Sequence, residues 1–121
     1  MNKKLKKSML SLSVMGLVLG MTTTNAFAAY PVLNPQQTYG TATTYATYSG
    51  NQISTKCSYT QWDVNNKAYT RSSSVSTSGP RSNTAHVGNI INGARKTAVT
   101  GTHNVYGSER YSTVKTAYWY R

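Results

Sequence analysis

The chain has 121 residues, and its 13 lysines and arginines against 2 acidic residues give a net charge of +11. A chain of this length holds at most one small domain, which excludes most large enzymes. Composition and charge therefore indicate the compartment, the fold class and the surface chemistry of the protein, but they do not identify its specific activity.

Residues 1–28 have the three parts of a secretory signal peptide. Four lysines lie within the first seven residues, residues 9–21 are mostly apolar, and Ala26-Phe27-Ala28 provides small residues at the two positions that a signal peptidase reads. The apolar run is shorter than the roughly 20 residues that span a bilayer. We predict cleavage between Ala28 and Ala29, and a secreted mature chain of bacterial origin without a transmembrane span.

The mature chain, residues 29–121, keeps nine cations and two acids, a net charge of +7. Leu, Ile and Val make only 11 of its 93 residues, whereas Tyr, Trp, Thr, Val and Ile together make 37. These last five residue types suit pleated, half-buried strands. We expect a loose lead-in over residues 29–40, which holds two prolines, and a single β domain with a thin core over residues 41–121.

Six β-prone runs follow in chain order, separated by turn-forming residues. They cover residues 41–48, 53–63, 67–77, 84–91, 94–101 and 110–120. The strongest hairpin signal is Asn92-Gly93, which would pair Ile91 with Ala94 and join the fourth run to the fifth. A turn at Asn65-Asn66 would place Trp62 opposite Tyr69 in the same way.

Alternation along the runs predicts which side chains face inward. Ile53, Cys57 and Tyr59 share one face of the second run, and in the last run Tyr118 and Tyr120 lie opposite Trp119. Large side chains on both faces of a strand imply that a second sheet covers one of them. We predict an all-β fold, an antiparallel β-sandwich or barrel of about six strands, with part of its aromatic side chains at the surface.

Catalytic candidates are few, and we predict that the protein is not an enzyme. Asp63 and Glu109 each adjoin a turn, where surface charges are more common than a glycosidase pair. A dyad of Cys57 with a histidine lacks a surrounding nucleophile motif. His103, Glu109 and Arg110 are close in sequence, as a basic nuclease would need, but nothing in the sequence places them on one face. A small secreted hydrolase is therefore a minor alternative.

The two histidines are 17 residues apart, without further ligands around them, so we predict neither a metal nor a cofactor. His86 is expected to be a half-buried sheet residue opposite Val99, and His103 a solvated loop residue.

Cys57 is the only cysteine, so the chain has no internal disulfide. We interpret it as an inert buried thiol, and the alternative is a bridge between two chains that makes a dimer.

An exported chain of this charge meets anionic partners, namely cell-wall polymers and lipid headgroups. Tryptophans interleaved with the cations strengthen this interpretation, because such rings stack on sugars or settle at a headgroup boundary. Nucleic acid is the less natural partner after export, and we expect no specific binding to it. The alternative is a secreted structural or interaction module whose basicity is incidental. The predicted envelope-binding residues are Lys67, Arg71, Arg95, Lys96, Arg110, Lys115, Arg121, Trp62 and Trp119.

Two segments of the last 40 residues resemble secreted β-sheet bacteriocins of the lactococcin 972 type. They are Ser82-Asn83-Thr84-Ala85-His86-Val87 before a turn and the aromatic ending Val114-Lys115-Thr116-Ala117-Tyr118-Trp119-Tyr120. The resemblance implies a small, exported antiparallel β protein that acts on the envelope of sensitive Gram-positive cells. This chain is longer at its mature N-terminus and carries Cys57 in the added part, so no site residue is transferred.

Overall fold

The computed structural model describes residues 29–121, so the predicted signal peptide lies outside the described residues. Over this range the fold is all-β, with antiparallel strands and no helix, as the sequence predicts. The strands are β1 (Tyr30–Pro35), β2 (Gly40–Tyr45), β3 (Gln52–Trp62), β4 (Ala68–Ser78), β5 (Ser82–Val87), β6 (Lys96–Tyr106) and β7 (Tyr111–Tyr120).

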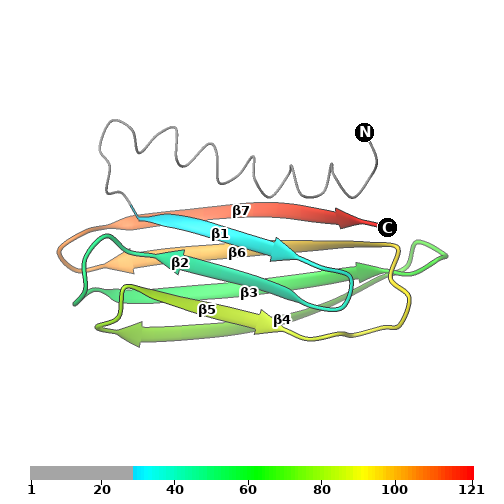
Figure 1. Cartoon of the computed structure of the whole chain (residues 1–121), viewed down its shortest axis with the longest axis horizontal. Helices are drawn as coiled ribbons and strands as arrows, with labels where there is room; N and C mark the ends of the chain where they lie inside the picture. Colours follow the sequence, from blue (N-terminus) through cyan, green and yellow to red (C-terminus); the bar gives the residue numbers. More distant parts are fainter. Residues whose placement is uncertain (1–28) are drawn as a thin grey trace.

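The strands form two sheets, in the orders β1-β2-β5 and β4-β3-β6-β7. Figure 1 shows the strands of both sheets running along the long axis of the molecule, with the two sheets overlapping. β1 packs against β6 and β7, and β5 packs against β3 and β4. The described part of the chain is therefore a sandwich of two separate sheets rather than one closed barrel.

The predicted lead-in over residues 29–40 is wrong, because most of it forms β1. Pro31, Leu33 and Pro35 are buried in alternation, and β1 pairs with β2 from Tyr30↔Tyr45 to Pro35↔Gly40. Both prolines are tolerated because β1 is an edge strand, where a missing N–H costs no ladder bond on the open side. The count of strands thus rises from the predicted six to seven.

The predicted hairpin at Asn92-Gly93 is also wrong. Gly93 does have a positive φ of 70°, but β5 pairs with β2, and β6 pairs with β3 and β7. The segment between β5 and β6 crosses from one sheet to the other. Gln61 holds it there, since its Oε1 accepts hydrogen bonds from the backbone N–H of Ile90 (2.7 Å) and of Ile91 (2.9 Å).

The hairpin at Asn65-Asn66 is confirmed, with a register one residue away from the prediction. Trp62 pairs with Ala68, and Tyr69 lies opposite Gln61. The connection is a five-residue loop rather than a two-residue turn, and Asn66 takes the left-handed conformation within it (φ 65°). A shift of one residue matters because it exchanges the faces of the paired side chains.

The core between the sheets is small and partly polar. Ile53, Cys57 and Tyr59 point inward from β3 as predicted, and all three are fully buried. Close approach of the sheets requires glycine at Gly101, where a Cβ would collide with the ring of His103 and with Leu33. The core mixes these groups with buried polar side chains, and each polar group must find a partner inside the protein.

The histidine predictions are both corrected. β6 continues to Tyr106 instead of ending at residue 101, so His103 is a fully buried strand residue rather than a solvated one. His86 does lie in β5, but it is exposed, with its ring stacked on that of Tyr39 at 5.7 Å between centroids.

Candidate functional site

One end of the four-stranded sheet gathers aromatic rings and cations on its outer face. The register places Trp62, Lys96 and Tyr120 side by side across β3, β6 and β7, and it places Tyr118 one row further along β7. Outward and inward positions alternate along each strand, so these side chains share one face. Neither Tyr118 nor Tyr120 was among the predicted binding residues, although their spacing of two residues shows that they share a face.

Lys96 lies at the centre of this group. Its Nζ is 4.4 Å from the centroid of the Trp62 ring, 5.7 Å from that of Tyr118 and 5.9 Å from that of Tyr120. The two tyrosine rings stack on each other at 6.1 Å between centroids. An ammonium near the faces of aromatic rings is attracted to their electron density. The rings therefore hold the charge of Lys96 at a defined place on the surface.

Two arginines join the same end through the backbone. The Arg95 N–H donates to the Trp62 carbonyl (2.9 Å), and the Arg121 N–H donates to the Arg95 carbonyl (3.0 Å). Both side chains are exposed. We call the set Trp62, Arg95, Lys96, Tyr118, Tyr120 and Arg121 the Lys96 cluster.

Lys67 lies in the adjacent loop between β3 and β4. Its Nζ is 5.4 Å from the Tyr69 ring centroid, and its N–H donates to Asp63 Oδ1 (3.0 Å). This N–H, together with a second from Asn65, lowers the pKa of the Asp63 carboxyl below its ordinary value. Asp63 is therefore a structural acceptor for the loop.

Four of the predicted binding residues lie elsewhere. Trp119 is only 7% exposed and faces the interior, so its proposed contact with an envelope is wrong. Arg71 pairs with the buried Tyr59 and thus belongs to the opposite side of β4 from the Lys96 cluster. Lys115 likewise pairs with the buried Gly101. Both cations are exposed because β4 and β7 are edge strands.

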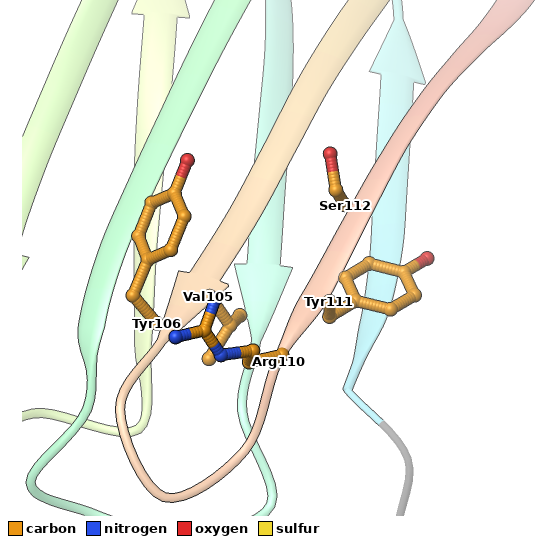
Figure 2. A pocket seen from close by; sticks show the side chains of 5 residues that line it. All are labelled: Val105, Tyr106, Arg110, Tyr111 and Ser112. Atoms are coloured by element: carbon orange, nitrogen blue, oxygen red, sulfur yellow. The ribbon is translucent and has the colours of Figure 1, made fainter.

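Arg110, the fourth, lies at the other end of the sheet, beside a shallow cavity of about 290 Å³. Figure 2 shows its guanidinium reaching from the start of β7 toward Val105 and Tyr106 at the end of β6. Tyr111 and Ser112 complete the lining. The cavity is separated from the Lys96 cluster by the length of β6, about 33 Å at the usual rise of a strand.

The two carboxylates are also at opposite ends, so they do not form a glycosidase pair. Asp63 follows β3 directly after Trp62, whereas Glu109 lies in the loop between β6 and β7. Glu109 Oε1 accepts hydrogen bonds from the Tyr48 N–H (3.0 Å) and from Asn51 Nδ2 (2.9 Å). Each carboxylate thus ties a loop together. Within residues 29–121 there is no group of three or more His, Cys, Asp or Glu that could hold a metal ion.

Between the Lys96 cluster and Tyr106 at the far end, most of the outer face is a ladder of hydroxyl groups that sequence reasoning missed. Cross-strand pairs join Thr60 to Thr70 (2.7 Å) and Thr100 to Thr116 (2.9 Å). The alternating serines from Ser72 to Ser78 are the sequence signal that could have shown it. We call this surface the hydroxyl face; its residues are Ser54, Lys56, Ser58, Thr60, Thr70, Ser72, Ser74, Ser76, Thr100, Thr102, Asn104, Ser112, Val114 and Thr116.

A second polar group is enclosed between the sheets. His103 Nδ1 lies 2.7 Å from Thr44 Oγ1, which lies 2.6 Å from Thr55 Oγ1, and Thr55 donates in turn to Asn83 Oδ1. His103 Nε2 has no hydrogen-bond partner and lies beside Gly101. Burial lowers the pKa of His103 to about 4, so this ring is neutral near pH 7.

Cys57 is fully buried in the core, where burial raises the pKa of its thiol to about 11. Such a thiol is protonated and shielded, which opposes reaction. A bridge between two chains through Cys57 stays a prediction, and it would require the sandwich to open.

No protein-family model and no curated protein matches this chain. Among solved structures, the chain is similar to Northeast Structural Genomics Consortium target SoR45, with 9% identity over 80% of this chain and 88% of that one and a TM-score of 0.44. A protein from Archaeoglobus fulgidus aligns with 11% identity over 77% of this chain and 94% of that one, with a TM-score of 0.26.

The described residues contain no helix of the length and apolar character that crossing a membrane requires.

Proposed function

We propose that the protein is exported, binds anionic components of the bacterial envelope and acts there as a bacteriocin-like antimicrobial factor. The observation that carries the proposal is the Lys96 cluster, in which the Lys96 ammonium lies within 4.4 to 5.9 Å of three ring centroids. Arg95 and Arg121 add two exposed cations at the same end.

The geometry favours binding because the central cation is held in place before a ligand arrives. A free lysine side chain loses rotamer freedom when it pairs with an anion, and a lysine already packed against rings loses less. Three cations at one end of the sheet raise the positive potential there, which attracts a polyanion.

The test compares two variants that remove the same charge from different places. Arg95→Gln/Lys96→Gln/Arg121→Gln removes the cations of the Lys96 cluster, and Arg71→Gln/Arg110→Gln/Lys115→Gln removes three others. Binding of the purified protein to Gram-positive cells and to vesicles with anionic headgroups is measured at low salt and at about 0.15 M, where exposed charges are screened over about 8 Å.

We expect binding to fall with salt, the first variant to bind about tenfold more weakly and the second to stay within about twofold of wild type. Equal loss in both variants would show that net charge alone attracts the protein and would contradict the role of the cluster. Binding that is insensitive to salt and to both variants would favour the alternative, a secreted structural or interaction module without killing activity.

Export is tested separately. N-terminal sequencing of the protein from culture supernatant should begin at Ala29 or within one or two residues of it, because Ala26-Phe27-Ala28 is the predicted cleavage site. An exported form that begins at Met1 would contradict the proposed processing.

A further inference from the structure

We propose that the hydroxyl face binds one chain of an anionic glycopolymer, a polymer with hydroxyl groups between its charges, laid along the strands and anchored at the Lys96 cluster. The inference rests on the proposed function and names its ligand class. The proposed ligand is a hydrated wall polymer rather than the lipid headgroups, which the same positive charge would also attract.

The first argument is the hydrogen-bonding capacity of the face. A hydroxyl group provides one donor and two acceptor positions. In the pairs Thr60/Thr70 and Thr100/Thr116 one of the two protons is used between the partners, so each pair keeps a proton and several lone pairs for a ligand. Ser58 and Ser72 form a third, longer pair at 3.4 Å. Neighbouring strands lie about 4.8 Å apart, so these groups form a regular polar grid.

The second argument is the sign and spacing of the charge. The only acidic residues of the chain, Asp63 and Glu109, lie outside the four strands of this sheet. Lys56 and Lys96 both occupy outward positions, and Lys56 pairs with Thr102, six residues along β6 from Lys96. At the usual rise this is about 20 Å. Two cations so far apart match a chain with repeated anionic groups better than a single small anion.

The third argument separates a polymer from a lipid surface. Proteins that settle into a headgroup layer present an apolar face to the acyl boundary. On the hydroxyl face the one large aliphatic side chain is Val114, which is 61% exposed, and the remaining residues are hydroxyl, amide or lysine side chains. The aromatic rings of this outer face lie at its two ends, in the Lys96 cluster and at Tyr106, which is 48% exposed. The face is therefore suited to hydrogen bonding rather than to insertion.

The experiment measures binding of the purified protein to three probes. These are purified wall teichoic acid, inorganic polyphosphate at the same phosphate concentration and vesicles with 30% phosphatidylglycerol by composition, on the order of natural anionic content. Teichoic acid carries hydroxyl groups and polyphosphate carries none. We expect the wild-type protein to bind teichoic acid more tightly than polyphosphate, although charge density alone would favour polyphosphate.

A matched pair of variants tests the face itself. Thr60→Val/Thr70→Val removes a hydroxyl pair of 2.7 Å from the hydroxyl face, and Thr43→Val/Thr84→Val removes a pair of the same length from the outer face of the three-stranded sheet. Valine keeps the β-branched shape, so both variants should fold, which circular dichroism checks. We expect the first to weaken teichoic acid binding about tenfold, with polyphosphate binding unchanged, and the second to leave both unchanged.

Three results would overturn the inference. Unchanged teichoic acid binding in Thr60→Val/Thr70→Val, or polyphosphate binding at least as tight as teichoic acid binding, would show that hydroxyl groups do not contribute. Binding to vesicles but to neither polymer would show that lipid headgroups are the ligand. In all three the proposed function survives, whereas a wild-type protein that binds none of the probes would overturn both.

Discussion

The two faces of the four-stranded sheet use the same residue types for different purposes. Trp119 on β7 is 7% exposed and packs between the sheets, whereas Trp62 on β3 stands on the outer face beside the Lys96 ammonium. Thr55 is fully buried, and Thr60 on the same strand is paired with Thr70 at the surface. Composition alone therefore does not separate the core of this protein from its candidate binding surface; the face of the strand does.

The buried face also depends more strongly on its polar contacts. Inside the sandwich the chain from His103 through Thr44 and Thr55 to Asn83 satisfies groups that water cannot reach. On the outer face water replaces any hydroxyl partner that is lost. Equivalent substitutions should thus cost much more on the inner face than on the outer one.

The largest contrast is expected between the two tryptophans. Trp119→Ala should lower the free energy of unfolding by about 3–5 kcal/mol, because it removes a large buried side chain from a small core. Trp62→Ala should cost about 1 kcal/mol or less and should weaken envelope binding, because its ring is half-buried and contacts Lys96. Urea unfolding measures the first effect, and cell or vesicle binding measures the second. A large loss of stability in Trp62→Ala would show that the Trp62 ring supports the fold as the Trp119 ring does, and would contradict this contrast.

Acidification should lower the free energy of unfolding of the protein through His103, which is buried between the sheets. The pKa of His103 is about 4 in the folded protein against 6.5 for an ordinary histidine, so the unfolded chain takes up a proton first as the pH falls. Stability is then constant above pH 6.5 and falls between pH 6.5 and 4. The loss should be about 2 to 3 kcal/mol.

Urea unfolding at several pH values measures this dependence. His103→Gln should be less stable near neutral pH and should lose most of the dependence in that window. His86→Gln is the control, because His86 is exposed, and it should keep the wild-type dependence. An unchanged slope in His103→Gln would show that another group titrates there.

The smallest expected contrast compares two threonines of β3. Thr55→Val should cost about 1–3 kcal/mol, since it leaves the buried Asn83 Oδ1 without its donor and removes one of the two hydrogen bonds of Thr44 Oγ1. Thr60→Val should stay within about 0.5 kcal/mol of wild type, because Thr70 can bond to water instead. Thermal unfolding of the two variants measures both. Equal costs would mean that the outer hydroxyl pairs stabilise the sheet as much as the inner ones.

Local sequence determined most of the strands and which side chains of a strand share a face. The period of two that a strand imposes is enough to place Ile53, Cys57 and Tyr59 on one face and to put Tyr118 and Tyr120 opposite Trp119. The turn at Asn65-Asn66 was likewise predictable as a hairpin, because its strands are neighbours in sequence. The predicted binding residues included Trp62, Arg95, Lys96 and Arg121, which the fold brings to one end of the sheet. They also included Trp119, Arg71 and Lys115, which it places elsewhere.

Tertiary structure alone decided which strands pair across long distances and which alternating face is covered. β5 pairs with β2, about 40 residues away, so Asn92-Gly93 bends a segment that changes sheets, and the same local turn signal fits either outcome. His103 is buried because β1 and β2 cover the inner face of β6, and Trp119 is buried by the same sheet. Alternation defines two faces for every strand, but only packing of the second sheet makes one of them the interior.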